Sequence, residues 1–151
     1  MTAPMEAIER LLIENECQKL ILTYSELYDQ GHWEALSDLF TVDALFISQL
    51  APKDLLISRF AILENYRSTA KRVTQHVTTN IYIEVESDTK ARSRSRILYS
   101  SNTESLLNTS LEKGHKEMRV GYFEDRLVLK ETGWKFAERK GSRVFAKYSR
   151  P

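Results

Sequence analysis

The spacing of the apolar residues changes near residue 74, and this change limits the possible folds more than any other feature of the sequence. Before residue 74, apolar residues recur at steps of three and four, as they do on one face of a helix. The first such series consists of Ile13, Cys17, Leu20, Tyr24 and Leu27. It predicts a helix over 6–28 that Gly31 ends, followed by a short helix over 33–40. A third helix is predicted over about 57–70, with Phe60, Leu63, and either Tyr66 or Arg67 facing inward.

After residue 74, apolar residues alternate with polar ones, which is the period of a strand with one buried face. Ile81, Ile83 and Val85 carry this pattern in a strand over 77–85, and residues 86–89 are typical of a hairpin turn. Further strands are predicted over 90–96, 118–129 and 134–145, and a short one over 44–48. Helices followed by antiparallel strands predict an α+β fold, with the helices packed on one face of a strongly curved sheet to form a cone. Residues 1–151 are expected to form a single domain.

The composition excludes several classes of protein. The chain has 22 Lys and Arg against 21 Asp and Glu, so it lacks the basic excess of a dedicated nucleic-acid binder. It has no secretory signal and no run of roughly 18 apolar residues, so we expect no membrane association. Cys17 is the single cysteine, and no Cys/His cluster has the spacing of a zinc site. These features predict a cytoplasmic protein without a metal centre.

Two polar segments need an interpretation of their own. Arg92, Arg94 and Arg96 alternate with small residues, so one face of their strand should be cationic and the other nearly bare. At this net charge, we interpret the cationic face as a solvated surface or a subunit contact and not as a nucleic-acid site. Residues 100–114 are rich in Ser, Asn and Thr and are expected to form a long hairpin end.

Four segments match one known family in order and spacing. They are residues 28–44 (YDQGHWEALSDLFTVDA), 75–80 (QHVTTN) with 88–91 (DTKA), 121–127 (GYFEDRL) and 133–139 (GWKFAER). Together they resemble the nuclear transport factor 2-like superfamily, and within it the SnoaL-like branch of small polyketide cyclases, dehydratases, isomerases and dehydrohalogenases. The resemblance covers nearly the whole chain. It implies a cone-shaped fold with an apolar pocket, usually as a homodimer built through the sheet.

The resemblance also implies a catalytic pair. In the dehydratase and dehydrohalogenase members, a His on the central strand is paired with an Asp at the end of the first helix. The matching positions here are His76 and Asp29. A Tyr precedes the Asp in the scytalone dehydratase-like members, as Tyr28 does in this chain. The second His and the additional Tyr of those enzymes have no match, and Ser48 stands about where that Tyr is expected.

The residue types of this pair suit proton transfer. An imidazole, with an ordinary pKa of ~6.5, accepts a proton at neutral pH, and a buried carboxylate fixes its tautomer. Tyr24 lies one turn before Tyr28, so both hydroxyls can approach one substrate oxygen. We expect proton abstraction beside a carbonyl or a leaving group, followed by elimination, isomerisation or cyclisation without a cofactor. The residues expected to form the pocket wall are Trp33, Phe46, Phe60, Phe123, Trp134 and Phe136.

Both members of the pair also have simpler interpretations. Asp29 lies close to Gly31 and is equally typical of a helix end or a turn. His76 has the opposite parity to Ile81 and Ile83, so it faces away from them unless a bulge near residues 78–79 shifts the strand.

Two functions from different classes remain open. The leading hypothesis is a cofactor-independent lyase, isomerase or cyclase that acts on a hydrophobic small molecule, with His76 as the base. The alternative is a non-catalytic binding or assembly module on the same cone, such as the small subunit of a ring-hydroxylating dioxygenase. Such a subunit would co-purify with a larger, iron-containing chain, whereas the enzyme would act as a homodimer on its own.

Overall fold

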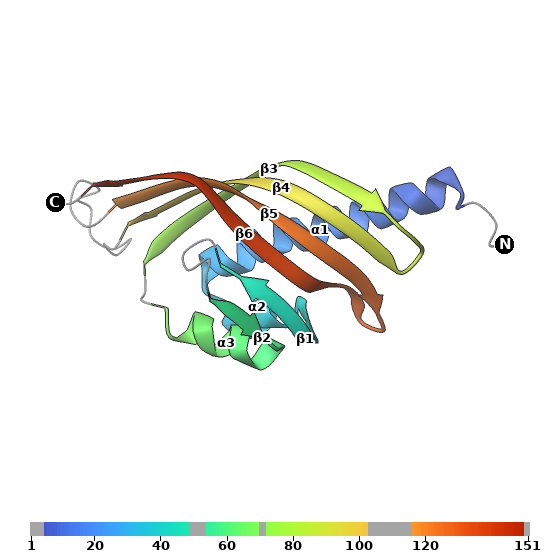
Figure 1. Ribbon diagram of the computed structural model, residues 1–151, viewed down its shortest axis with the longest axis horizontal. Coiled ribbons are helices and arrows are strands. Elements are labelled where there is room, and N and C mark those ends of the chain that lie inside the picture. Colours follow the sequence, from blue (N-terminus) through green and yellow to red (C-terminus); the bar gives the residue numbers. More distant parts are fainter. Residues whose placement is uncertain (1–4, 49–53, 70–71, 103–115, 150–151) are drawn as a thin grey trace.

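The computed structural model describes residues 5–48, 54–69, 72–102 and 116–149. The chain begins with helices α1 (Ala7–Gln30) and α2 (Trp33–Ser37), strands β1 (Phe40–Ile47) and β2 (Leu55–Ile57), and helix α3 (Arg59–Arg67). Four long strands follow, namely β3 (Val73–Val85), β4 (Lys90–Asn102), β5 (Lys116–Lys130) and β6 (Gly133–Ser149) (Figure 1). The fold is α+β as predicted, although β2 was not predicted and each of the other five strands is longer than its sequence pattern indicated. Most of the predicted hairpin end at 100–114 lies outside the described residues.

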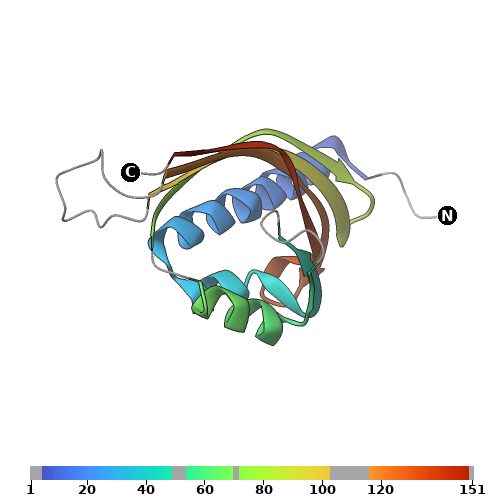
Figure 2. The same cartoon turned by 60° about the vertical axis from the view of Figure 1, so that its left-hand side comes forward.

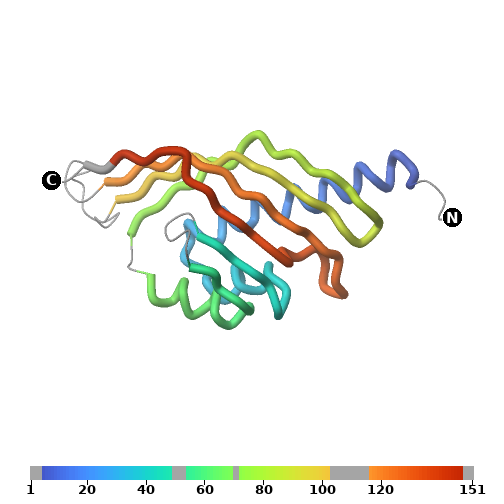
Figure 3. Tube along the Cα trace, viewed as in Figure 1, coloured from blue at the N-terminus to red at the C-terminus, as the bar shows by residue number. Residues whose placement is uncertain are grey.

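The six strands form one sheet in the order β2-β1-β6-β5-β4-β3. The long strands β3 to β6 run side by side (Figure 3), and each pairs antiparallel with the next. Strands β1 and β6 pair in parallel, so the sheet is mixed, whereas a purely antiparallel sheet was predicted. Parallel pairing needs a long connection, and the chain between β1 and β6 provides it. The sheet curls over α1, with α2 and α3 on the other side of that helix (Figure 2).

Helix α1 ends immediately after the residues that matter for the site. Gly31 has φ 72° and lies in the left-handed region, where a residue without Cβ is favoured. Its amide donates to the carbonyl of Tyr28 at 3.0 Å, and the amide of His32 donates to that of Leu27 at 3.0 Å. These two bonds satisfy carbonyls at the helix end, and they fix the position of Asp29 in the last turn. No helix within the described residues has the length and hydropathy needed to cross a bilayer.

Helix α3 faces the core with only some of the residues predicted, because Tyr66 is buried as one alternative had it, whereas Phe60 is not. Ile62 and Tyr66, four residues apart, are buried, whereas 71% of Phe60 is exposed. The helix starts only at Arg59, because residues 55–57 pair with β1 as strand β2, and Ser58 caps it by accepting from the amide of Ala61 at 3.2 Å. The prediction that Phe60 belongs to the pocket wall is therefore wrong.

Strand β4 has the two faces that its sequence predicted. The inner face of the strand is buried and carries Ala91, Ser93, Ser95 and Ile97. The arginines between them are exposed on the outer face, where Arg94 and Arg96 lie 4.7 Å and 5.5 Å from the ring centre of Tyr122.

Candidate active site

His76 reaches the inner face of the sheet because strand β3 contains a bulge. The register between β3 and β4 shifts between Thr79 and Tyr82, which confirms the predicted bulge close to its expected place. Asn80, inside the shift, has φ 49°, a conformation that its short polar side chain tolerates. His76 before the bulge and Ile83 after it consequently lie on the same side of the sheet.

The carboxylate of Asp29 holds His76 from the end of α1. Its Oδ1 lies 2.6 Å from Nδ1 of His76 and accepts a hydrogen bond from Oγ1 of Thr74 at 2.8 Å. Its Oδ2 accepts from the backbone amide of His76 at 2.8 Å. Because an ionised carboxylate can only accept, Nδ1 of the neutral ring carries the proton and Nε2 keeps the free lone pair. Asp29 therefore sets both the position and the tautomer of the imidazole.

The environment keeps Asp29 ionised. Burial acts to raise the pKa of this carboxyl, but the hydrogen bonds from His76 and Thr74 outweigh it, and the pKa lies below its ordinary value. The side chains of His76 and Asp29 are only 7% and 13% exposed. The pair is thus a shielded hydrogen-bonded unit with a permanent negative charge on its helix side.

A cavity of about 50 Å³ lies beside the imidazole. Tyr28 and Tyr99 border the ring of His76, with centroids 4.7 Å and 4.8 Å from its own. A neighbouring hollow of about 310 Å³ shares Tyr28 and Thr69 with the cavity and also contacts Asp29. The cavity and the hollow together offer space next to the imidazole and the carboxylate of Asp29.

Buried hydroxyls from the helices face the same cavity. The Oη atoms of Tyr24 and Tyr66 lie 2.6 Å apart in a hydrogen bond. Burial raises the pKa of Tyr24, Tyr28 and Tyr66 above the ordinary value of tyrosine, so these phenols stay protonated and able to donate.

Apart from the exposed Phe60, the aromatic residues predicted for the pocket wall divide into three groups. Phe46 and Phe123 line the cavity beside His76. Trp33 lines the neighbouring hollow. Phe136 and Trp134 lie on β6 and pack in or against the hydrophobic core, and they do not line the cavity. The ring centroid of Phe136 lies 6.0 Å from that of Tyr24 and 5.2 Å from that of Phe40, within the core.

Among the other lining residues, Tyr99 and Arg119 were not predicted for the site, and Tyr66 was expected only as one alternative for the inner side of α3. Tyr99 pairs directly with His76 across β3 and β4, and continuing the alternation of residues 91–97 by one step would have placed it inward. Arg119 has the same inward parity on β5 as Phe123, but a strand arginine is usually a surface residue. Its burial depends on partners from other strands, which a linear pattern does not show.

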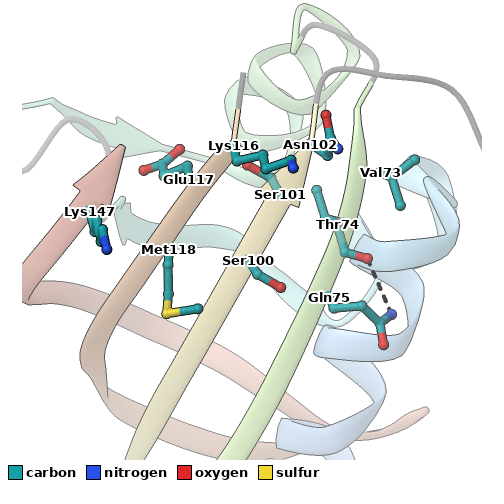
Figure 4. A pocket seen from close by; sticks show the side chains of 10 residues that line it. All are labelled: Val73, Thr74, Gln75, Ser100, Ser101, Asn102, Lys116, Glu117, Met118 and Lys147. Atoms are coloured by element: carbon teal, nitrogen blue, oxygen red, sulfur yellow. Dashed lines mark hydrogen bonds between the residues drawn. The ribbon is translucent and has the colours of Figure 1, made fainter. Parts of the chain in front are cut away.

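Other features of the structure do not offer comparable chemistry. A hollow of about 480 Å³ at the ends of β3, β4 and β5 is lined partly by outward-facing residues such as Gln75, Ser100 and Met118 (Figure 4). Among the described residues, no group of three or more His, Cys, Asp and Glu side chains is placed to hold a metal ion.

The sequence profile of the SnoaL-like domain matches residues 9–140. No sequence match to a curated protein was found. Several solved structures are similar in fold. A scytalone dehydratase-type protein from Novosphingobium aromaticivorans DSM 12444 is 24% identical, with a TM-score of 0.80 over 94% of this chain and 91% of that one.

Two further structures extend this similarity. The hexachlorocyclohexane dehydrochlorinase LinA-type3 from Novosphingobium barchaimii LL02 is 15% identical, with a TM-score of 0.79 over 95% of this chain and 94% of that one. An NTF2-like protein with a cystatin-like fold from Novosphingobium aromaticivorans is 19% identical, with a TM-score of 0.71 over 91% and 85%. The profile match covers most of the chain, and the structures share its architecture, so the chain belongs to the SnoaL-like domain family and has the NTF2-like, cystatin-like fold.

Proposed function

We propose that this protein is a cofactor-independent lyase or isomerase that removes a proton from a carbon atom of a hydrophobic small molecule. His76 is the base and Asp29 orients it. The observation that carries the proposal is the 2.6 Å contact between Nδ1 of His76 and Oδ1 of Asp29 at the edge of a largely aromatic cavity. A helix cap alone does not require a carboxylate that also accepts from Thr74 and from the backbone of His76.

The proposed reaction begins with cleavage of a C–H bond in the substrate. The proton moves to Nε2 of His76, and the charge of Asp29 stabilises the resulting imidazolium. The electron pair of the C–H bond forms a carbon–carbon double bond. In an elimination, the leaving group departs with its own bonding pair, whereas in an isomerisation the proton returns to a different carbon. Where a substrate oxygen acquires negative charge during the reaction, the phenols of Tyr28 and Tyr24 donate hydrogen bonds to that oxygen.

The expected rate acceleration can be divided between the general base and the hydrogen-bond donors. Help from a general base accelerates a reaction by typically about 10²–10⁴-fold. The remaining acceleration must come from oriented donors in surroundings that exclude water, where each hydrogen bond to a developing charge is stronger than in water. The buried phenols around His76 are suited to that task.

The similar structures support elimination as the reaction class. Two of them are named as a dehydratase and a dehydrochlorinase, and both names describe an elimination, of water in the first case and of hydrogen chloride in the second. This similarity contributes the reaction class to the proposal, while the choice of residues rests on the hydrogen bonds of His76.

A substrate screen with matched variants tests the proposal. Hydrophobic alcohols, ketones and halides would be incubated with the wild-type protein in D₂O, and proton NMR would detect elimination, isomerisation or exchange. For any compound that reacts, we expect His76→Gln to lower turnover by about 10²–10⁴-fold. His32→Gln is the control, because His32 is exposed and makes no side-chain capping bond. Equal loss in both variants, or full turnover in His76→Gln, would refute the base assignment.

A further inference from the structure

Three side chains form one row across the inner face of the sheet. His76 on β3 pairs directly with Tyr99 on β4, and Tyr99 pairs directly with Arg119 on β5. The ring centroid of Tyr99 lies 4.8 Å from that of His76 and 4.3 Å from Cζ of Arg119. The imidazole and the guanidinium thus flank a single phenol ring, and all three residues line the same cavity.

The guanidinium of Arg119 is buried without a full set of partners. Only 4% of the residue is exposed. Its Nε forms an ion pair with Glu117, but its Nη2 has no hydrogen-bond partner. The Oη of Tyr99 is also buried without a partner. Buried donors of this kind destabilise a fold unless a ligand or a water molecule satisfies them, so the two donors in this cavity are available to an acceptor that binds there.

The charges around the cavity favour an anion. Glu117 faces Arg72 at 3.8 Å as well as Arg119, so one carboxylate serves two guanidinium groups. Within the described ranges, no other carboxylate forms an ion pair with either arginine. Asp29 is already engaged by Thr74 and by the ring and amide of His76. Among the described residues, the two guanidinium groups therefore share one carboxylate within ion-pair distance, which leaves one of them without a carboxylate of its own.

We propose that Arg119 and Tyr99 bind the carboxylate of the substrate. The substrate class is then a hydrophobic carboxylic acid, whose reactive carbon lies against His76 and whose carboxylate lies on the far side of the Tyr99 ring. Nη2 of Arg119 donates to one carboxylate oxygen and Oη of Tyr99 to the other, an arrangement that a planar two-oxygen anion matches. The choice of reactive carbon rests on the proposed function, whereas the binding of the anion does not.

Binding of a matched pair of probes tests this inference. Benzoate and its neutral isostere benzamide would be titrated by calorimetry into the wild-type protein. Because a hydrogen bond to a charged group is stronger than one between neutral groups, we expect benzoate to bind about tenfold more tightly or better. No preference for benzoate in the wild-type protein would overturn the inference without any variant.

Two variants then assign the preference to Arg119. Arg119→Gln should abolish the preference by weakening benzoate and leaving benzamide unchanged, whereas Arg126→Gln, at an exposed position on the same strand, should keep it. If Arg119→Gln does not fold, Arg119→Lys keeps the charge and should retain part of the preference. An unchanged preference in a folded Arg119→Gln variant would show that this guanidinium is only structural.

The test separates the inference from the proposed function. His76→Gln should keep the preference for benzoate, because His76 does not contact the anion in this scheme. Selective binding of benzoate together with full turnover in His76→Gln would refute the catalytic proposal and support the anion site. A reaction that depends on His76, together with no preference for benzoate, would support the catalytic proposal and refute the anion site.

Discussion

At the scale of single residues, the two oxygens of Asp29 decide what His76 can do. They accept three hydrogen bonds from Thr74 and from the ring and backbone of His76. An amide in this position has only one accepting oxygen, so at least one of these donors must lose its partner. The orientation and the tautomer of the ring therefore depend on a carboxylate and not merely on a polar side chain of that shape.

Replacement of this carboxylate gives the first prediction. We expect Asp29→Asn to lower turnover by up to about 10²–10⁴-fold and to increase the fraction of His76 that carries its proton on Nε2. Nitrogen-15 NMR of the imidazole measures the tautomer directly. Asp43→Asn, at an exposed position on β1, is the matched control. An Asp29→Asn variant with the wild-type tautomer and rate would contradict the role given to Asp29.

A second buried carboxylate affects stability through pH. Asp125 lies 3.7 Å from Nη1 of Arg139, whose guanidinium is enclosed by the rings of Tyr24, Phe123 and Phe136. Burial raises the pKa of Asp125 from 3.8 to about 6, although Arg139 and the hydroxyl of Ser93 oppose this change. Between these two values, the folded protein binds a proton that the unfolded chain has released. Asp125 therefore contributes most to stability at low pH, and its contribution falls as the pH rises through this window.

Urea unfolding at a series of pH values tests this sign. We expect the stability of the wild-type protein to include a component that decreases between about pH 4 and pH 6 and that Asp125→Asn lacks. The comparison uses the slope against pH, so a general loss of stability in the variant does not affect it. Asp88→Asn, in the exposed β3–β4 turn, should keep the wild-type slope. Identical slopes in the wild type and Asp125→Asn would refute the assignment.

At the scale of elements, the bulge in β3 allows one strand to serve two purposes. Its first half presents His76 to the cavity, and its second half presents Ile83 and Val85 to the core. The side-chain period of a strand is two, so without the additional residue one of these halves would face outward. The left-handed conformation of Asn80 makes this change of parity possible.

Substitution of Asn80 tests the bulge. A β-branched residue is strongly disfavoured at φ 49°, so we expect Asn80→Val to lower the free energy of unfolding by about 1–2 kcal/mol, whereas Asn80→Gly should be nearly neutral. Tyr82→Val is a control at an exposed position on the same strand. Chemical denaturation provides the measurement, and a destabilisation no larger in Asn80→Val than in Tyr82→Val would argue against a strained bulge.

The strands and helices differ in how well their positions could be predicted from the sequence. The conflict in parity between His76 and Ile81 was visible in the pattern and left two explanations open, and the structure contains the bulge that was one of them. For α3, the alternative that placed Tyr66 inward was right and the inward placement of Phe60 was wrong, because the buried face is centred on Ile62 and Tyr66 and tertiary contacts set the rotation of so short a helix. The parallel pairing of β1 with β6 and the burial of Arg119 could not be predicted, since both depend on contacts between segments far apart in the chain.

At the scale of the whole molecule, the outer face of the sheet carries an apolar row. Val77, Leu98, Val120 and Phe145 pair with one another in turn across β3, β4, β5 and β6. Val77, Leu98 and Phe145 are 54%, 39% and 57% exposed. Exposed apolar residues scattered singly are common, but a contiguous row across four strands indicates an interface. We propose that a second copy of the chain covers it, in a homodimer built through the sheet.

Light scattering on size-exclusion chromatography tests the dimer. The wild-type protein should elute with twice the mass of the chain, and Phe145→Lys should shift the population towards monomer, because a charge buried in an apolar contact is costly. Leu12→Lys, at an exposed position on α1, should leave the mass unchanged. A monomeric wild type, or a Phe145→Lys variant that remains fully dimeric, would rule out this interface.

The most direct test of His76 as the catalytic base is a single-turnover measurement of the rate of C–H cleavage. The rate is measured for the wild-type protein and for His76→Ala, each with and without added imidazole. The reactant is the compound that the screen identifies, with and without deuterium at the reactive carbon. Removal of a proton by His76 predicts a primary isotope effect in the wild type, loss of cleavage in His76→Ala, and partial recovery when free imidazole occupies the vacated space beside Tyr28 and Tyr99. Cleavage by His76→Ala at the wild-type rate without imidazole would contradict the account.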